Sequence, residues 1–417
     1  MNVGILTIGN ELTGGRIQDT NSALIARTAQ EQGWQVSAML SVGDDWDAIR
    51  DALEFLLARA DALVVTGGLG PTADDITTAA VAKAFGLALR TDEAVLTHIR
   101  TLFEQRRLTW TENNAKQAVF PEGAEVIDNP SGTAAGFAVR QGGKVVAVIP
   151  GVPAEARRML PEGVTPLFRK AFPEAALHVE TATFKLFGIT ESAVDTAVAD
   201  VDFAGLGVGV GFYPRFPENH LVLTARTALA QEAKEKIRAA GELVEARLAK
   251  HIFARDDETI EKIIAEGLTK QGLTLAVAES CTGGLITDRL TDVPGSSAFL
   301  ERGVVTYSNA AKIALLGVPE AVIREHGAVS AETARLMAEG VRQMAGTDLG
   351  LAVTGIAGPS GGTEAKPVGT VHIALADGQS TVERRHSLRW DRRRNKVMAS
   401  QAALLMLQRH LAGEKDL

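Results

Sequence analysis

The chain has 417 residues, more than one hydrophobic core usually serves, so we expect two or three domains. Its hydrophobic content of 46% and charged content of 23% are typical of a soluble globular protein. The formal net charge of −8 argues against general binding to nucleic acid or to anionic membranes and leaves only a local basic patch open. Its single cysteine excludes an intramolecular disulfide and a cysteine-rich zinc site.

Neither a signal peptide nor a membrane span is expected. We interpret residues 1–8 as a strand, because no basic segment precedes the apolar run and no cleavage site follows it. No apolar run approaches the ~18 residues that would cross a bilayer. We therefore expect a cytoplasmic protein.

Strands and helices alternate in the N-terminal third. Apolar runs predict strands at residues 3–8, 34–39 and 62–65, and helical patterns lie between them at about 21–32 and 46–59. This order predicts an α/β fold with a doubly wound parallel sheet. Such sheets bind ligands at the carboxyl ends of their strands.

A glycine-rich loop, TGGLGPTADDIT at residues 66–77, follows the third predicted strand. Three glycines between a strand and a helix can form a nest for an anion, although the spacing fits neither a P-loop nor a dinucleotide-binding fingerprint. Asp74 and Asp75 would repel a phosphate, so we predict that they hold a divalent metal or bind sugar hydroxyls. A glycine-rich turn with an acidic helix cap is the alternative interpretation.

Four further loops share this small-residue chemistry: GNEL at 9–12, DTN at 19–21, NPSGTAAG at 129–136 and PGVPAE at 150–155. Together with the glycine-rich loop they resemble the N-terminal domain of the CinA family. The resemblance implies a molybdopterin-binding-like fold with metal-dependent pyrophosphatase activity on ADP-ribose and related nucleotides. No Nudix box is present, so that activity would have to come from these loops. A pterin- or nucleotide-binding module without turnover is the alternative.

The resemblance supplies the expected N-terminal site. Its nucleotide-binding residues are Asn10, Glu11, Asp19, Asn21, Gly67, Gly68, Gly70, Thr72, Ser131, Gly132, Thr133, Pro150 and Gly151. Its expected cofactor is a divalent metal (Mg, Mn or Co), and whether a monovalent cation also binds is left open. The expected metal ligands are Asp74 and Asp75.

The middle of the chain predicts a small α+β module, with strands at 184–188, 206–213 and 220–225 and helices at 191–201 and 231–248. The family resemblance implies a KH-like domain. RNA-binding KH domains need a Gly-x-x-Gly loop between helices, and the glycines of residues 205–211 alternate within a strand instead. We interpret the module as a spacer, a dimerisation element or a lid. Tyr213, Arg215 and His220 could reach a site, but ordinary core or surface positions are the favoured interpretation.

In the last third of the chain, a predicted strand at residues 273–278 runs into Glu279, Ser280 and Cys281, and a helix follows at 285–290. A hydroxyl at the end of a buried strand, followed by Thr-Gly-Gly, is how a nucleophile meets an oxyanion or phosphate site. A helix N-cap is the ordinary alternative.

Further motifs follow in order: PGSS at 294–297, RGVVTYSNAAK at 302–312, HGAVS at 326–330, TGIAGPSGG at 354–362, KPVGTV at 366–371 and a basic stretch at 384–396. This series resembles the CinA C-terminal domain, whose stand-alone relatives are nicotinamide mononucleotide deamidases. The resemblance places the family's serine at Ser280, its tyrosine at Tyr307 and its lysine at Lys312. Its arginine falls within Arg392, Arg393 and Arg394, of which Arg392 is the best match because it follows Asp391.

The residue types support amide hydrolysis without a metal. Ser280 would attack the carboxamide carbon, and Lys312 could accept its proton if burial or a neighbouring cation lowers the lysine pKa. Tyr307 would relay or hold that proton. The expected substrate-binding residues are Cys281, Thr282, Gly283, Thr354, Gly355, Gly358, Gly361 and Gly362. Cys281 is the rival nucleophile, although no histidine in its motif could activate it; the role of Glu279, catalytic or structural, stays open.

We therefore expect three domains: residues 1–170, a nucleotide pyrophosphatase; residues 171–253, a KH-like linker; and residues 254–417, a nicotinamide mononucleotide deamidase. The expected partners are small nucleotides, nicotinamide mononucleotide and ADP-ribose, with no membrane and no nucleic acid. The resemblance also implies a homodimer. A competence- or damage-associated interaction protein is the alternative, and the intact Ser280, Tyr307 and Lys312 favour the enzyme.

Overall fold

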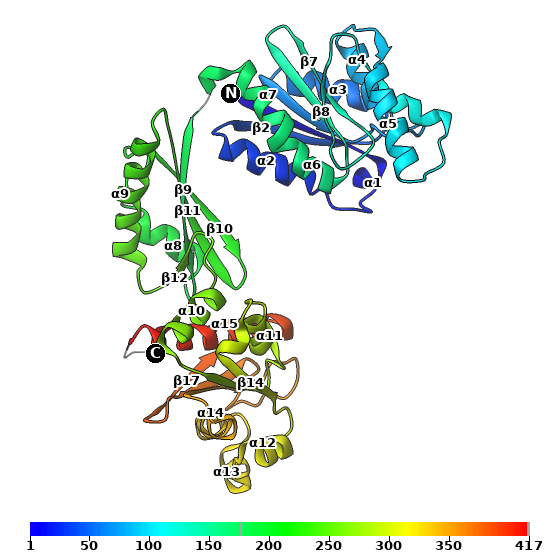
Figure 1. Cartoon of the computed structure of the whole chain (residues 1–417). Helices are drawn as coiled ribbons and strands as arrows, with labels where there is room; N and C mark the ends of the chain where they lie inside the picture. Colours follow the sequence, from blue (N-terminus) through cyan, green and yellow to red (C-terminus); the bar gives the residue numbers. More distant parts are fainter. Residues whose placement is uncertain (176, 415–417) are drawn as a thin grey trace. The chain divides into compact units, whose positions relative to one another are not determined.

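A computed structural model of the chain describes residues 1–175 and 177–414 (Figure 1). Residue 176, which the sequence analysis assigns to the middle module, and residues 415–417, assigned to the C-terminal domain, lie outside the described residues. The chain divides into two compact units, Met1–Glu180 with Ala225–Lys236, and Thr181–Thr224 with Ile237–Leu417. No helix in the described part combines the length and apolar character needed to cross a membrane.

The N-terminal domain contains a six-stranded sheet in the order β2-β1-β3-β8-β7-β6. Its strands are β1 (Asn2–Ile8), β2 (Gln35–Val42), β3 (Ala62–Thr66), β6 (Glu125–Ile127), β7 (Gly136–Gln141) and β8 (Lys144–Ile149). β1 pairs in parallel with β2 and β3, and β3 with β8, which confirms the predicted doubly wound parallel sheet. β7 runs antiparallel to both β8 and β6, an extension that the sequence analysis does not predict.

Helices cover both faces of this sheet, which is why its central strands are apolar without alternation. The other elements of the domain are α1 (Asn10–Thr13), α2 (Asn21–Glu31), α3 (Trp46–Leu57), α4 (Thr77–Ala84), β4 (Leu89–Thr91), α5 (Glu93–Gln105), a 3-10 helix at Glu112–Ala118, β5 (Val119–Pro121), α6 (Pro153–Met159), a π-helical segment at Leu160–Val164, α7 (Thr165–Ala171) and a 3-10 helix at Pro173–Ala175. Val3 and Ile5 of β1 pack on one face with α2, whereas Leu6 and Ile8 pack on the other with α3.

The register of the parallel strands brings three loops to one edge of the sheet. Thr7 of β1 pairs with Thr66 of β3, and Thr66 pairs with Ile149 of β8. All three strands end at this row or one residue beyond it, so the loops that follow them start next to one another. This edge is where parallel sheets bind ligands.

The middle module has a sheet in the order β10-β11-β9-β12, with two helices. Its elements are β9 (His178–Leu186), α8 (Glu191–Val198), β10 (Val208–Arg215), β11 (Glu218–Thr227), α9 (Ala230–Leu248) and β12 (Ile252–Arg255). The predicted α+β character is confirmed, with β10 two residues later than expected. The sequence analysis misses β12, a strand of only 4 residues that becomes visible through its antiparallel pairing with β9.

The C-terminal domain contains a five-stranded sheet in the order β14-β13-β15-β16-β17. Its elements are α10 (Ile260–Gln271), β13 (Leu275–Glu279), α11 (Leu285–Thr291), a 3-10 helix at Ser296–Ala298, β14 (Leu300–Val305), α12 (Asn309–Leu316), α13 (Glu320–His326), α14 (Ala331–Ala345), β15 (Leu349–Gly355), β16 (Thr370–Ala376), β17 (Thr381–Ser387) and α15 (Arg392–Leu411). β13 pairs in parallel with β14 and β15, and β16 and β17 continue the sheet antiparallel. The α/β fold class is thereby confirmed for this domain as well.

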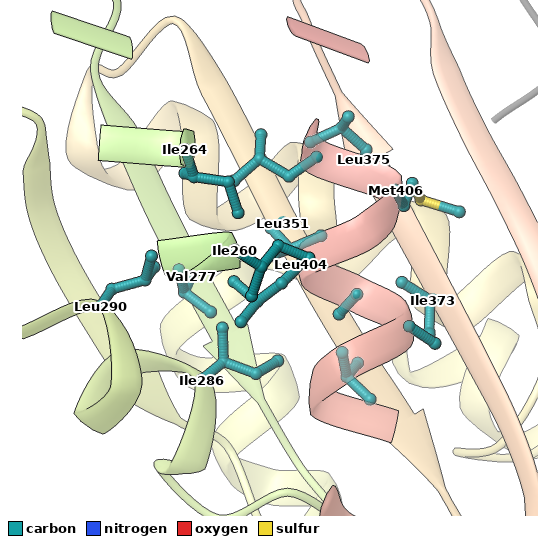
Figure 2. Packing of buried hydrophobic residues seen from close by; sticks show 14 of the residues in the cluster. Ile260, Ile264, Val277, Ile286, Leu290, Leu351, Ile373, Leu375, Leu404 and Met406 are labelled. Carbon is teal, nitrogen blue, oxygen red and sulfur yellow. The ribbon is translucent and has the colours of Figure 1, made fainter. Parts of the chain in front are cut away.

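One hydrophobic core fixes the position of β13 within this domain. Figure 2 shows Val277 of β13 and Leu351 of β15 among side chains from α10, α11 and α15, including Ile264, Ile286 and Leu404. All five side chains are completely buried. Burial of such a side chain contributes about 1.5–3 kcal/mol, so this packing stabilises the position of β13 in the domain. A second cluster on the other face packs α13 and α14 against the same strands.

Candidate functional site

The hydroxyl of Ser280 lies at the carboxyl end of β13, where the sheet passes into a turn. The Ser280 backbone N–H donates to the carbonyl oxygen of Val353 on β15, which extends the parallel pairing by one residue. Only 7% of Ser280 is exposed. The serine is therefore held by the central strands of the domain.

Lys312 of α12 reaches this hydroxyl. Its Nζ lies 3.0 Å from Ser280 Oγ and donates to the carbonyl oxygen of Thr306 at 2.7 Å. Ser308 caps α12 by accepting a hydrogen bond from the Ala311 N–H, and this cap fixes the start of the helix that carries the lysine. The structure thus brings together two of the predicted catalytic residues.

Burial lowers the pKa of the Lys312 amine, because the ammonium form loses its hydration while only 1% of the residue stays exposed. Its hydrogen-bond partners are a hydroxyl and a carbonyl, and no carboxylate pairs with it among the described residues. A neutral amine next to a serine hydroxyl can accept the proton of that hydroxyl.

Cys281, the rival nucleophile, is 6% exposed. Burial raises the pKa of its thiol to about 12, and the nearby amines of Lys312 and Lys396 only partly oppose this rise. The reactive form of a cysteine is the thiolate. The contact of 3.0 Å between the Lys312 amine and the Ser280 hydroxyl, together with the raised pKa of the Cys281 thiol, therefore favours Ser280 as the nucleophile.

The Glu279 carboxylate holds the turn that follows Ser280. It is completely buried and accepts hydrogen bonds from the backbone N–H groups of Gly284 (2.9 Å), Ile286 (3.1 Å) and Thr287 (2.9 Å). The Thr287 hydroxyl donates to it as well, at 2.8 Å. Gly283 and Gly284 take positive φ values of 65° and 96°, which allows this tight turn. With both oxygens engaged, Glu279 acts as a structural acceptor.

Tyr307 and Arg392 form a second pair. Arg392 donates from Nη2 to the Tyr307 hydroxyl at 2.8 Å and from Nη1 to the Gly358 carbonyl oxygen at 2.7 Å. Arg394 instead stacks on Trp390, so Arg392 is the arginine that meets the predicted tyrosine. No hydrogen bond within the described structure joins Tyr307 to Ser280 or Lys312, which favours a binding role for Tyr307 over a proton relay.

The other predicted substrate-binding residues differ in their hydrogen bonds and backbone conformation. Thr354 donates to the Ala328 carbonyl oxygen, so its side chain connects the end of β15 to the loop between α13 and α14. Thr282 is completely buried, and its hydroxyl has no hydrogen-bond partner in the described part of the chain. Gly361 takes a φ of 89°, and a Cβ on Gly362 would approach the Val368 nitrogen to 2.7 Å. These glycines shape the loop that Arg392 contacts at Gly358.

The N-terminal domain has a separate cleft at the carboxyl edge of its sheet. It encloses about 540 Å³ and is lined by Ile8, Gly9, Glu11, Ile17, Asp44, Gly67, Gly68, Leu69, Gly70, Asp74, Asp75, Gln117, Thr133, Ala134, Pro150, Gly151, Val152, Pro153 and Glu155. The Asn21 amide holds two of its loops together, because it donates to Thr66 Oγ1 at 3.1 Å and to the Gly151 carbonyl at 2.8 Å. Nine of the predicted nucleotide-binding and metal residues line this cleft: Glu11, Gly67, Gly68, Gly70, Asp74, Asp75, Thr133, Pro150 and Gly151.

The other predicted N-terminal residues support the loops. Asp19 accepts hydrogen bonds from Thr7 and Ser22, which lowers its pKa against the opposing effect of burial. The Thr72 hydroxyl donates to both Asp74 and Asp75. The remaining residues form backbone contacts: the Asn10 N–H donates to Asp44, and the N–H groups of Ser131 and Gly132 donate to Asn129.

Carboxylates dominate the charge of this cleft. Burial raises the pKa of Asp44, and the carboxylates of Asp74, Glu11 and Asp75 raise it further, against the effect of one backbone hydrogen bond. No lysine or arginine lines the cleft within the described residues. Oxygen donors that repel one another fit a divalent cation, which would relieve the repulsion. No group of three or more His, Cys, Asp or Glu side chains in the described structure is already arranged to hold one.

Comparisons with known proteins match the chain in three consecutive parts. Residues 4–170 match the model of a probable molybdopterin binding domain, residues 181–254 that of the damage-inducible protein CinA KH domain, and residues 257–411 that of the CinA C-terminal domain. A CinA-like protein from Syntrophus aciditrophicus (strain SB) is 62% identical over 413 residues, which cover 99% of this chain and 98% of the relative. The chain belongs to the CinA family.

Other members of the CinA family are also similar. A CinA-like protein from Geobacter sp. (strain M21) is 46% identical over 415 residues, covering 100% of this chain and 99% of the relative. The crystal structure of a competence/damage inducible protein from Agrobacterium tumefaciens is 40% identical, with a TM-score of 0.35; the match covers 37% of this chain and 95% of that one. The three family models and the 62% identical relative confirm the resemblance inferred from the motifs.

Three residues of this CinA-family chain are not among the predicted site residues, although one of them, Glu155, belongs to the PGVPAE loop at 150–155. Asp44 and Glu155 line the N-terminal cleft, and Asp44 follows the end of β2, where an acidic residue is a recognisable signal. Lys396 lies one helical turn after Arg392, and its Nζ is 3.5 Å from where a Cβ on Gly283 would be. Its amine has no hydrogen-bond or ion-pair partner among the described residues. The i, i+4 spacing from Arg392 is the signal that could have identified it.

We predict that Cys281 alkylates very slowly in the folded protein. With a thiol pKa of about 12, its thiolate fraction at pH 8 is far below that of an ordinary cysteine, so iodoacetamide should react at least about 100-fold more slowly than in the denatured chain. Mass spectrometry at timed intervals measures both rates, and the denatured chain is the internal control. Equal rates would contradict the burial described above.

Proposed function

We propose that the C-terminal domain hydrolyses the carboxamide of nicotinamide mononucleotide, with Ser280 as nucleophile and Lys312 as general base. The observation that carries this proposal is the contact of 3.0 Å between Ser280 Oγ and a buried lysine amine that has only neutral partners. The motif series and the membership of the CinA family support the choice of substrate.

The proposed reaction needs two half-reactions. As Ser280 Oγ bonds to the carboxamide carbon, its proton passes to Lys312, and the carbonyl oxygen becomes an oxyanion. When the carbon–nitrogen bond breaks, Lys312 returns the proton to the leaving nitrogen and ammonia departs. Water then attacks the resulting ester with Lys312 again as base, which releases nicotinate mononucleotide and restores the serine.

Binding would use the rest of the site. The backbone N–H groups of Cys281 and Thr282 would stabilise the oxyanion, since Glu279 accepts from those of the later residues Gly284 and Thr287 and so holds the turn in one conformation. Arg392 and Lys396, four residues apart on α15, would contact the 5′-phosphate, because guanidinium and ammonium groups are the usual partners of phosphates. Tyr307 would orient Arg392 through their hydrogen bond.

In the N-terminal domain, we propose metal-dependent hydrolysis of the pyrophosphate of ADP-ribose or a related dinucleotide. Asp74 and Asp75, with Asp44, Glu11 and Glu155 around them, would hold the divalent metal. When bound, such a metal polarises a phosphoryl oxygen and activates water. The glycine-rich loops would let the substrate approach the backbone. A binding module without turnover is the second candidate, and it is favoured by the absence of a preformed metal-ligand group in the described residues.

The first test is ammonia release from nicotinamide mononucleotide in the presence of EDTA. We expect turnover in the wild type and a loss of at least about 1,000-fold in Ser280→Ala, because this variant lacks the hydroxyl that forms the ester in the proposed mechanism. Ser387→Ala, at an exposed position on β17, is the matched control and should keep wild-type activity. Loss of turnover in EDTA would contradict the metal-free mechanism. Activity retained in Ser280→Ala would contradict the assignment of Ser280 as the nucleophile.

The pH dependence of this reaction tests the assignment of Lys312 as a general base with a lowered pKa. Because burial lowers the pKa of Lys312, its amine becomes neutral at a lower pH than an ordinary lysine, whose pKa is about 10.4. We expect kcat/KM to rise with pH and to reach half of its maximum clearly below that value. The same shift means that the unfolded chain binds more protons than the folded chain between the two pKa values, so folding stability also rises with pH in that interval. A half-maximum at or above the ordinary lysine pKa would contradict this assignment.

The N-terminal proposal is tested by AMP release from ADP-ribose. We expect release with Mg²⁺, Mn²⁺ or Co²⁺, its loss in EDTA and its return on metal addition. Asp74→Asn should lower the rate about 100-fold or more, since it removes a charged metal ligand at an exposed position. Asp51→Asn, an exposed aspartate on α3, is the control. No AMP release with any of these metals would favour the binding module.

A further inference from the structure

The hairpin between β10 and β11 of the middle module contacts the start of α15. Phe216 occupies the turn between the two strands, and its ring packs edge-on against Trp390, with the ring centroids 5.4 Å apart. The Arg394 guanidinium lies over both rings, 5.3 Å from the Phe216 centroid and 5.5 Å from that of Trp390. All three residues belong to the second compact unit. Aromatic pairs and cation–π contacts of this geometry are attractive.

This contact leads directly to the candidate substrate-binding arginine. Asp391 caps α15 by accepting a hydrogen bond from the Arg394 N–H at 3.0 Å, and Arg392 is the first residue of the helix. The conformation of this first turn therefore decides where the Arg392 guanidinium points. Its targets are the Tyr307 hydroxyl and the Gly358 carbonyl oxygen.

A buried asparagine connects the same turn to the glycine loop. Asn395 is 1% exposed; its Oδ1 accepts from the Trp390 N–H at 3.1 Å, and its Nδ2 donates to the Trp390 carbonyl at 2.8 Å. Nδ2 also donates to the carbonyl oxygen of Ala357 at 3.0 Å, next to Gly358. The Trp390 backbone, the first turn of α15 and the loop at Gly358 are thus one hydrogen-bonded assembly.

We propose that Phe216 is a positioning residue for this assembly, through which the middle module sets the substrate affinity of the C-terminal site. The proposal rests on the amidase function proposed above. Phe216 packs on Trp390 and Arg394, and these hold the turn that aims Arg392 and the backbone at Ala357 and Gly358. The Ser280–Lys312 pair is held by β13 and α12, and no described contact of Phe216 reaches either residue. Phe216 should therefore influence binding of the substrate far more than the chemical step.

The experiment compares ammonia release from nicotinamide mononucleotide by the full chain and its Phe216→Ala, Phe216→Tyr and Tyr213→Ala variants. Loss of the ring should raise KM about three- to ten-fold while kcat stays within about two-fold, the size expected when weak aromatic and cation–π contacts are lost. Phe216→Tyr keeps the ring, and its hydroxyl can reach solvent because Phe216 is 42% exposed, so it should restore the wild-type KM. Tyr213, 54% exposed on β10 of the same hairpin, is the matched control and should leave KM unchanged.

Amide hydrogen exchange gives a second readout that needs no turnover. Peptides that cover residues 388–396 and 356–362 should exchange faster in Phe216→Ala than in the wild type, and at the wild-type rate in Tyr213→Ala. An unchanged KM and unchanged exchange in Phe216→Ala would overturn the proposal, as would an equal effect of Tyr213→Ala. If the wild type releases no ammonia, the amidase function fails, and the exchange comparison alone decides whether Phe216 positions α15.

Discussion

The buried amine of Lys312 is the feature on which the C-terminal site depends. An ammonium group inside a protein without a counter-ion is strongly disfavoured, so folding pushes this lysine toward its neutral form. The same burial places the amine against a serine hydroxyl and a backbone carbonyl, at a distance suited to proton transfer. The reactivity of Ser280 in the proposed mechanism therefore comes from the packing of β13 and α12 rather than from any unusual property of the serine.

The N-terminal and C-terminal domains both place their candidate sites at the carboxyl edge of parallel strands, but the charged groups at the two sites have opposite signs. In the N-terminal domain the loops after the parallel strands line an open cleft rich in carboxylates, which suits a bound cation. In the C-terminal domain the carboxylate of Glu279, the residue before the nucleophile, accepts four hydrogen bonds from the following turn, and α15 contributes the positive charges of Arg392 and Lys396. Positively charged side chains around a site favour binding of an anionic substrate, here one proposed to react without a metal.

The hairpin of the middle module contacts the segment that precedes and begins α15, the helix that carries the candidate binding arginine. This hairpin packs on Trp390 and Arg394, and the Asn395 side chain joins the Trp390 backbone to the loop at Ala357 by hydrogen bonds. β12 pairs with β9 and leads into α10, so the sheet of the module and the helical layer of the C-terminal domain are adjacent in the chain. The interpretation of the module as a spacer, a dimerisation element or a lid stays a prediction, and the aromatic contact is compatible with each of them.

Much of the fold follows from local patterns along the chain. Continuous apolar runs of about six residues, alternating with helical patterns and ending in glycine-rich loops, indicate parallel strands covered on both faces, because only such strands are buried on both sides. The motifs around Ser280, Lys312 and the loop of Gly67 are likewise contiguous, so they are recognisable without coordinates. The antiparallel strands β7 and β17 are less recognisable, since their direction depends on which neighbour they meet.

What local patterns cannot supply is contact between distant segments. Lys312 is an ordinary helical lysine until α12 packs beside β13, and only that packing removes its water and lowers its pKa. Tyr307 and Arg392 are 85 residues apart, and the sequence favours Arg392 among three adjacent arginines only because it follows Asp391, whereas the folded chain directs its guanidinium to the tyrosine. Phe216 and Trp390 are further apart still. The sequence specifies which groups are available and where the strands end, whereas burial, charge coupling and long-range pairing exist only after the chain has folded, because each depends on atoms contributed by segments that are remote in sequence.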